Sequence, residues 1–219
     1  MNNLFANISN QNLEKLLKLL RADTFTCKKG VSLSYLMNDN FVGIVLEGYL
    51  EVIKRDYEGH RSIIETLEPM QVFGTTISSL NSPDYDIETI LDSKIILIDY
   101  NNILNFLEKG NHSYQKFLTN LLVIVTNKIS EKNERITILT QKSIRNKLLE
   151  YFKITSLKNN SRHIYIPTTY TELAEYLAVD RSAMSRELKN LQNEGFIDIK
   201  NKTEISIVFI SHDLGAVAK

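Results

Sequence analysis

Residues 169–199 (TYTELAEYLAVDRSAMSRELKNLQNEGFIDI) constrain the fold more than any other stretch of the chain. They have the pattern of two short amphipathic helices joined by a tight turn. Thr169 and Glu172 fit a capping box, in which the threonine hydroxyl accepts from the first turn and the glutamate reaches back to the cap. Small and apolar residues at helical spacing then predict close packing against a second helix: Leu173, Ala174, Leu177 and Ala178.

The second helix is expected over residues 181–194. Asp180 precedes it as an N-cap, and its charge suits the positive end of the helix. Gly195 stands where a left-handed C-cap is needed. The spacing of three apolar residues predicts the buried stripe of this helix: Met184, Leu188 and Leu191.

Polar residues remain on the other side of this second helix, toward its N-terminal end: Arg181, Ser182, Ser185 and Arg186. Arginine can pair bidentately with guanine, and serine can bond a base edge or a phosphate. With the strand-like segment 196–199 behind it, the pattern indicates a winged helix-turn-helix whose second helix enters the DNA major groove. The alternative is an ordinary two-helix corner whose polar residues face water.

Composition limits the other functions. The 219 residues suffice for one large core or two smaller ones, and no apolar run reaches the roughly 20 residues that span a bilayer. The N-terminal segment MNNLFANISNQNLEKLL lacks the basic and apolar stretches of a signal peptide. A single cysteine, Cys27, excludes an internal disulfide and a cysteine-rich metal site. We therefore expect a cytoplasmic protein that uses no cofactor and does not enter a membrane.

The net charge is zero, but the charges are unevenly divided along the chain. From residue 141 onward there are 12 Lys and Arg against 9 Asp and Glu, whereas the preceding residues have 14 against 17. A mildly basic C-terminal part beside an acidic N-terminal part suits a DNA-reading module joined to a sensor.

Residues 23–100 follow a different pattern, in which short apolar strands alternate with turn residues. This pattern predicts an antiparallel barrel or jelly roll, preceded by an amphipathic helix over residues 10–21. We assign residues 1–112 to this jelly-roll sensor domain. Four glycines fall at the breaks between strands, where positive φ is tolerated without steric cost: Gly30, Gly48, Gly59 and Gly74.

From about residue 113 to residue 140 the apolar residues recur at helical spacing. They form a heptad stripe that only Lys132 interrupts. A small barrel does not cover such a stripe, so we expect the helix to pair with the same helix of a second subunit. The alternative is that it lies wholly along its own barrel. Residues 113–140 are thus assigned as the dimerisation helix and residues 141–219 as the winged helix-turn-helix domain. The predicted interface residues are Leu118, Leu122, Val125, Ile129, Ile136 and Leu139.

With this order of barrel, long helix, helix-turn-helix and wing, the chain resembles the CRP/FNR family of bacterial transcription regulators. The resemblance covers nearly the whole chain. It is strongest in LAEYLAVDRSAMSRELKNLQNEGFI, which looks like the family's recognition-helix signature, and extends to the segments KKG, LEGYLEV, EGHRSIIETLEP and VFG. It implies an α+β fold with a cyclic-nucleotide-binding-like jelly roll, a long dimerisation helix and a C-terminal winged helix-turn-helix.

The resemblance also assigns DNA contacts. It implies base reading by Arg181, Ser182 and Arg186. Ser182 departs from the family, which often carries Glu at this position and so can accept from cytosine. The operator is therefore not expected to match those of the best-known relatives. Contacts to phosphate are expected from Thr169, Tyr170, Ser185 and Lys189.

The sensor part departs from the family at its ligand site. Relatives that bind cyclic AMP have Gly-Glu after the Phe and an Arg-Ser or Arg-Thr pair further on, whereas this chain has FGTTI at residues 73–77 and no arginine in residues 82–87. Asp84, Asp86 and Glu88 are expected to repel a cyclic phosphate. We therefore predict that cyclic AMP is not the effector, which the sequence leaves unknown.

Two other sensing chemistries remain as alternatives. The oxygen-sensing branch of the family uses a cluster of cysteines, which one cysteine cannot supply. Haem could be held through His60 or His112, although a lone histidine on a loop is more often only solvated. Cys27 could act as a redox switch if the two lysines that follow it lower its pKa, although a buried structural cysteine is commoner.

Together these observations predict a homodimeric, sequence-specific DNA-binding transcription regulator that is not an enzyme. Its operator should be an inverted repeat with half-sites about 34 Å apart. RNA polymerase would be a further partner if the protein activates transcription. One alternative is a cupin-like metalloenzyme, which needs more histidines than the single His60 of the barrel. The other is a ligand-binding sensor or adaptor without a DNA role, for which a degraded recognition helix would be expected.

Overall fold

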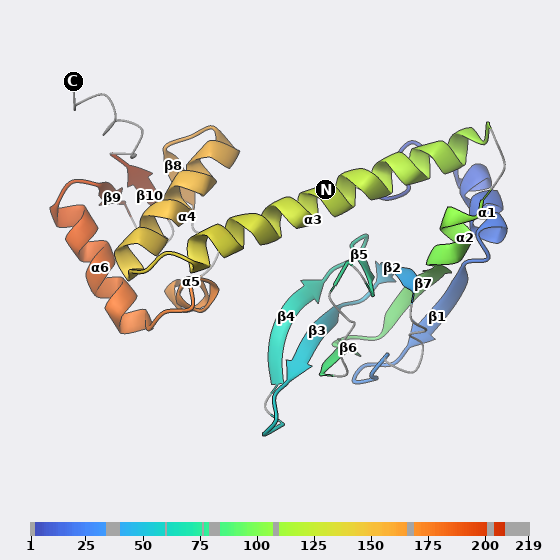
Figure 1. Cartoon of the computed structure of the whole chain (residues 1–219), viewed down its shortest axis with the longest axis horizontal. Coiled ribbons are helices and arrows are strands. Elements are labelled where there is room, and N and C mark those ends of the chain that lie inside the picture. The colour runs from blue at the N-terminus through green and yellow to red at the C-terminus, as the bar shows by residue number, and fades with distance from the viewer. Residues whose placement is uncertain are drawn as a thin grey trace. The chain divides into compact units, whose positions relative to one another are not determined.

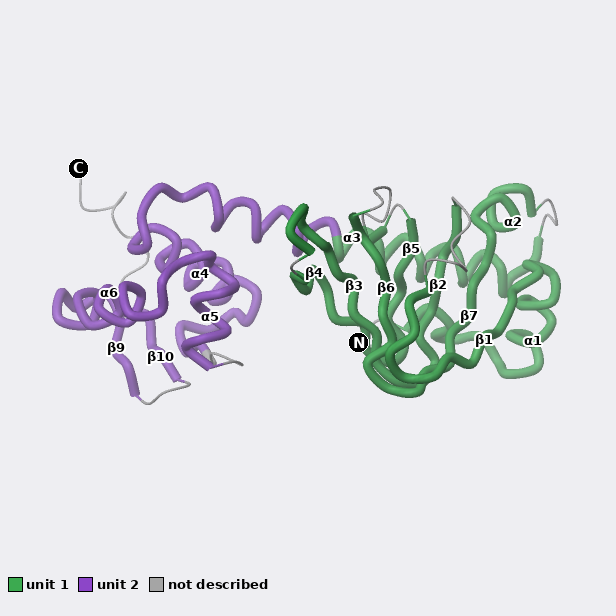
Figure 2. Tube along the Cα trace, turned by 90° about the horizontal axis from the view of Figure 1, so that it is seen from below, with its two compact units in different colours: residues 1–128 green, residues 129–219 purple. Residues whose placement is uncertain are grey.

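The computed structural model describes residues 3–33, 40–59, 61–75, 77–78, 84–106, 110–165, 169–200 and 204–208. The chain divides into two compact units, Met1–Lys128 and Ile129–Lys219 (Figure 2). One long helix, α3 (His112–Leu139), continues from the first unit into the second. The assignment of three domains, with boundaries after residues 112 and 140, stays a prediction.

Unit 1 is built on two antiparallel sheets (Figure 1). Short strands rich in Val, Ile and Leu form them, as the alternation with turn residues predicts. The strand order is β1-β7-β2-β5 in the first sheet and β4-β3-β6 in the second. The strands are β1 Asp23–Cys27, β2 Phe41–Glu47, β3 Leu50–Arg55, β4 Arg61–Leu67, β5 Val72–Gly74, β6 Tyr85–Thr89 and β7 Ser93–Asp99.

One core of unit 1 joins side chains from both sheets. Val45 of the first sheet and Val52 and Ile87 of the second are fully buried within it. Phe73 fills the space beside Gly43, where an added Cβ would come within 2.3 Å of the phenyl ring. Strand β2 can therefore approach Phe73 closely only because residue 43 has no side chain.

Helices cover the other face of the first sheet (Figure 1). Val42 and Ile44 of β2 lie opposite Ile98 and Ile96 of β7, and all four side chains are buried in one core with Phe117 of α3. The remaining helices of this unit are α1 (Asn10–Leu19) and α2 (Tyr100–Leu104). The predicted first helix is two residues too long, because Arg21 has a left-handed φ of +50° and cannot continue it.

Three of the four glycines at the strand breaks use the positive φ that glycine tolerates. Gly30, Gly48 and Gly59 have φ of +79°, +88° and +83°. Gly74 has no positive φ. It is confined instead by close approach, because a Cβ there would lie 2.4 Å from the carbonyl oxygen of Phe41.

Unit 2 contains a helical core and a small sheet of order β8-β10-β9. Apolar side chains from four helices and this sheet pack together, among them Ile138, Phe152, Leu173, Leu188 and Ile205. The predicted wing segment supplies the edge strand β9, which pairs with β10. The elements are α4 Ile144–Asn159, β8 His163–Tyr165, α5 Tyr170–Tyr176, α6 Arg181–Asn193, β9 Ile197–Ile199 and β10 Glu204–Ile207.

These elements confirm the predicted α+β fold class, with antiparallel sheets, a long helix and a C-terminal helix-turn-helix followed by a wing. Within the described residues, the hydrogen bonds between strands do not close the two large sheets into one continuous barrel. The same part of the chain has no helix with the length and apolar character needed to cross a membrane.

Candidate nucleic-acid interface

The helix-turn-helix begins at α5 with the predicted cap. The Thr169 hydroxyl accepts from the backbone N–H of Glu172 at 3.3 Å, and the backbone N–H of Thr169 donates to the Glu172 carboxylate at 2.7 Å. The capping box is therefore confirmed. Leu173 and Ala174 on the inner side of α5 are buried in the core of unit 2, which fixes this helix as the support of the next one.

The turn between α5 and α6 is held from α4. Ala178 has a left-handed φ of +50°, which turns the chain sharply after α5. The ammonium group of Lys147 donates to the carbonyl oxygens of Leu177 at 3.0 Å and Ala178 at 3.4 Å. These carbonyls lie at the negative end of α5, where a cation is stabilising. The role of Lys147 could not be predicted from the sequence, because it depends on a contact 30 residues away.

The second helix, α6, begins at the predicted residue, ends one residue before the predicted end and has the predicted buried side. Asp180 accepts from the backbone N–H of Ala183 at 2.7 Å, and Gly195 has a φ of +78° just beyond the helix. Both capping predictions are therefore confirmed. The three residues predicted as its inner stripe are buried to 0–1 % exposure: Met184, Leu188 and Leu191.

The predicted base-reading residues lie on the exposed side of α6. At 100° per residue, Arg181, Ser182, Ser185, Arg186 and Lys189 fall within an arc of about 140° that excludes the buried stripe. Arg181, Ser182 and Arg186 are exposed and form no hydrogen bond or ion pair with any described residue. Their polar groups are therefore available to a ligand. We name this set of five residues the α6 polar face.

Arg145 of α4 binds two acidic side chains, Glu187 and Glu194, away from the α6 polar face. The Arg145 guanidinium donates to Glu194 at 3.0 Å and to Glu187 at 3.3 Å, and its carbon lies 5.0 Å from the ring centroid of Phe196. Hydrogen bonding with Glu194 raises the pKa of Arg145, and the same bond lowers the pKa of Glu194. The charges that remain on the α6 polar face are all basic. The role of Arg145 could not be predicted from the sequence either, because Glu194 lies 49 positions away.

The predicted phosphate contacts lie in two places. Ser185 and Lys189 belong to the α6 polar face, where Ser185 is half-buried and Lys189 exposed. Thr169 and Tyr170 lie at the start of α5. The Thr169 hydroxyl is already engaged in the capping box, and burial raises the pKa of the half-buried Tyr170 phenol. The contacts of these four residues with phosphate stay predictions.

The predicted dimer stripe lies mainly on the exposed side of α3. Leu122, Ile129 and Ile136 are 67 %, 53 % and 57 % exposed, and Leu118 is 36 % exposed. In contrast, Phe117, Leu121, Ile124 and Ile138 are buried against the cores of the two units. Val125 and Leu139 of the predicted stripe are half-buried. An exposed apolar stripe of this kind is what a paired helix would cover.

The acidic residues of the sensor part are less free than expected. Asp86 accepts from the Ser32 hydroxyl at 2.9 Å. Glu88 forms ion pairs with Arg55 and, at 3.2 Å, with Arg61. The prediction of an unpaired negative charge is therefore wrong at Glu88, because Arg55 of β3 and Arg61 of β4 neutralise its carboxylate. The exclusion of cyclic AMP as effector stays a prediction.

The alternatives that rested on cysteine and histidine gain no support from the structure. Cys27 is buried, and burial raises the pKa of its thiol, opposite to the lowering that a reactive switch needs. His112 is exposed at the first turn of α3, and His60 lies outside the described residues. Within the described ranges, no three His, Cys, Asp or Glu side chains gather in a group able to hold a metal ion.

Known proteins resemble this chain most clearly in unit 2. The family model of the Crp-like helix-turn-helix domain matches residues 144–210, which include α4, α5, α6 and the wing. No curated protein matches the chain.

Solved structures resemble the chain over nearly its whole length. A CooA mutant from Carboxydothermus hydrogenoformans matches with a TM-score of 0.57 and 18 % identity, over 96 % of this chain and 97 % of that one. The catabolite activator protein of Thermus thermophilus matches with a TM-score of 0.51 and 17 % identity, over 98 % and 97 %. A cyclic nucleotide-binding domain containing protein from Listeria monocytogenes matches with a TM-score of 0.54 and 17 % identity, over 89 % and 97 %. At these identities the likeness concerns the fold.

Proposed function

We propose that the chain is a transcription regulator of the CRP/FNR type and a homodimer that binds an inverted-repeat operator through α6. The match of residues 144–210 to the Crp-like helix-turn-helix model and the fold shared with solved structures support this proposal. Each α6 enters one major groove, and the two half-sites lie about 34 Å apart. The protein works in the cytoplasm, catalyses no reaction and has double-stranded DNA as its principal partner.

The observation that carries this proposal is the state of the α6 polar face. Arg181, Ser182 and Arg186 are exposed and form no bond with any described residue, while the nearby acidic groups pair with Arg145. A guanidinium that is not already paired can bond guanine O6 and N7 without first breaking a contact within the protein. The small Ser182 leaves room beside the two arginines but selects bases weakly.

The proposed dimer rests on the exposed stripe of α3. Leu122, Ile129 and Ile136 follow each other at intervals of seven residues, as the seam of a coiled coil requires. Two copies of α3 that pair along this seam present two copies of unit 2. A ligand that changes the pairing changes operator affinity, because the pairing sets the separation of the two α6 helices.

Selection of bound duplexes from a random DNA pool by the purified full-length protein tests both parts of the proposal. We expect an enriched inverted repeat whose two half-sites are one helical turn apart. The variant Arg181→Ala/Arg186→Ala serves as the reference, because it removes both base-reading arginines and leaves the buried side of α6 intact.

Each outcome of the selection bears on a different part. Enrichment of a single, unrepeated site would contradict the symmetric dimer. Equal recovery of all sequences, by the protein and the double variant alike, would contradict base reading by α6. The variant Lys18→Ala, which alters an exposed lysine of α1, should select the same sequence as the unaltered protein.

A further inference from the structure

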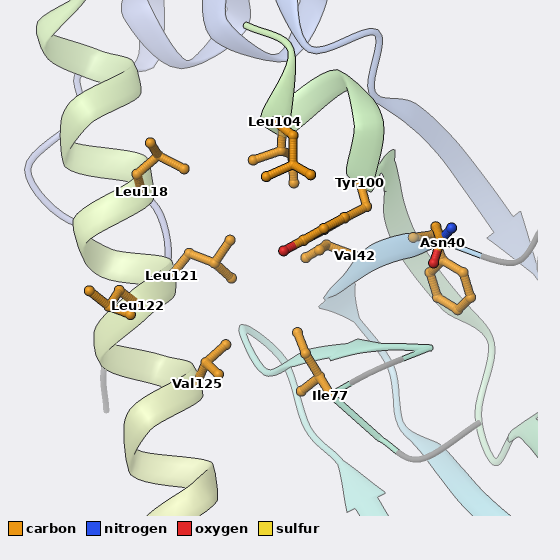
Figure 3. Close-up of a pocket in the computed structure, with 11 residues that line it drawn as sticks. Asn40, Val42, Ile77, Tyr100, Leu104, Leu118, Leu121, Leu122 and Val125 are labelled. Atoms are coloured by element: carbon orange, nitrogen blue, oxygen red, sulfur yellow. The ribbon is translucent and has the colours of Figure 1, made fainter. Parts of the chain in front are cut away.

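We propose that unit 1 binds a small, uncharged and mainly apolar molecule in a pocket between β2, α2 and α3. This inference deepens the proposed function, because it names the chemical class of the effector. The pocket has a volume of about 350 Å³, within the range of about 300–1,000 Å³ typical of small-molecule sites (Figure 3).

The pocket is a recess with a buried floor and an exposed rim. Val42 of β2, Ile103 of α2 and Leu121 of α3 form part of its floor and are only 2 %, 2 % and 9 % exposed. Leu104 and Leu122 lie at its rim and are 60 % and 67 % exposed. An apolar ligand that fills the recess would transfer its own apolar surface from water to this lining, which provides the main free energy of binding.

The lining excludes a charged ligand. Nine of the 11 described residues that line the pocket have hydrocarbon side chains, and none of the 11 is charged. A phosphate or carboxylate would lose its hydration here and gain no cation in return. The pocket thus suits a different ligand class from a cyclic nucleotide.

One polar group within the pocket can orient a ligand. Figure 3 shows the Tyr100 side chain extending across the space, with its hydroxyl oxygen toward α3. This hydroxyl forms no hydrogen bond with any described residue. A ligand with a single hydrogen-bonding atom on an apolar body would complement it.

The space between the two sheets is a poorer candidate for such a ligand. There the ring of Phe73 lies against Gly43 and packs edge-on against Phe41, with ring centroids 5.9 Å apart. The pocket lies instead where Val42 faces the helices, and Ile77 is the only residue of segment 73–78 that is among its described lining residues. The site is thus defined by α2 and α3 more than by that segment.

The same pocket is connected to the proposed dimer seam. Leu118, Leu122 and Val125 line it, and all three belong to the predicted interface stripe of α3. A ligand that moves these side chains therefore changes the surface offered to the second copy. A second α3 paired along the seam would cover the mouth of the pocket. The floor, which includes Val42, Ile103 and Leu121 of the chain itself, would remain available to the ligand.

Fluorescence titration of the full-length protein with N-phenyl-1-naphthylamine tests the proposal. This probe is uncharged, mainly apolar and has a single N–H. We expect saturable binding of one probe per chain. Leu104→Trp fills the pocket from α2 without altering the seam and should weaken binding at least about tenfold. Tyr100→Phe removes only the hydroxyl and should weaken binding about two- to tenfold.

Leu19→Trp provides the matched control, because it alters an exposed leucine of α1 outside the pocket. It should bind the probe as the unaltered protein does. Equal binding by the Leu104→Trp variant and the unaltered protein would overturn the site. So would binding that appears only after the dimer is dissociated, since the second copy would then be the occupant.

Operator affinity measured on the same proteins, with and without the probe, distinguishes a failure of this inference from a failure of the proposed function. Saturable probe binding that Leu104→Trp abolishes, in a protein that binds no DNA, would support the pocket and contradict the DNA role. Probe binding that leaves both dimer dissociation and operator affinity unchanged would overturn the coupling. The expected result is a change of at least about threefold in operator affinity, absent in Leu104→Trp.

Discussion

Two helices of this protein, α3 and α6, each have one buried side and one exposed side, but the exposed sides differ in chemistry. Leu122, Ile129 and Ile136 are exposed on α3, whereas Arg181 and Arg186 are exposed on α6. Charged groups are well hydrated, so α6 can stay uncovered at little cost. Exposed leucine and isoleucine side chains are poorly hydrated, so covering them lowers the free energy. This difference supports the proposed protein partner for α3 and the proposed polyanion for α6.

The largest expected effect follows from breaking the apolar side of α3. Ile129→Asp places two carboxylates at the seam and should raise the dimer dissociation constant about 100-fold or more. Sedimentation equilibrium measures the change. Asn127→Asp is the control, because residue 127 is exposed and lies about 160° around the helix from Ile129. A dimer that survives Ile129→Asp would show that α3 does not pair along this stripe.

The next effect concerns the α6 polar face. Arg186→Ala should weaken binding to the selected operator by about 1–3 kcal/mol and relax the preference at one base pair. Lys189→Ala should instead weaken binding to all sequences alike and reduce the salt dependence by about one ion. Competition with operators altered at single positions distinguishes the two. A uniform loss in Arg186→Ala would reassign that arginine to phosphate.

A smaller effect is expected at the turn that supports α6. Ala178→Gly should raise the free energy of unfolding by about 0.5–1 kcal/mol, because glycine adopts the left-handed conformation of residue 178 without a Cβ penalty. Ala178→Val should lower it. Chemical denaturation followed by circular dichroism measures both. Equal stability of the three proteins would mean that the turn stores no strain.

The smallest effect concerns the pairing of Arg145 with Glu194. The pKa of Glu194 is lowered in the folded protein, so this pair stabilises the fold above the ordinary pKa of a glutamate and loses that effect as the pH falls. Arg145→Ala should therefore lower the melting temperature at pH 7, by about 2 °C, and much less at pH 3. Lys142→Ala, at a neighbouring exposed position, should lower it at neither pH. A loss that is the same at both pH values would assign the effect to packing on Phe196.

Local signals in the sequence predicted much of the fold. The cap at Thr169, the cap at Asp180 and the left-handed Gly195 each depend on neighbours within three or four residues, and all three are confirmed. The buried stripe of α6 follows from helical periodicity in the same way. These features could be predicted because their physical causes lie within one turn of chain.

Features that depend on distant parts of the chain could not be predicted. Arg145 meets Glu194 across 49 positions, and Lys147 meets Leu177 across 30. The neutralisation of Glu88 by Arg55 depends on the pairing of strands, and the confinement of Gly74 depends on a neighbouring carbonyl. The pocket draws on β2, α2 and α3, and its lining shows no common pattern along the sequence.

The α3 helix has a consequence for how this protein can diverge. Leu118 and Leu122 line the pocket and also belong to the proposed dimer seam. Further along the same helix, Ile138 is buried in the core of unit 2. A substitution in α3 that alters ligand preference therefore also alters pairing of the two subunits. A substitution at Leu104 or Ile77 changes the pocket without changing the proposed seam. New ligand preferences should therefore accumulate first on α2 and in the segment after β5, and α3 should change more slowly than either.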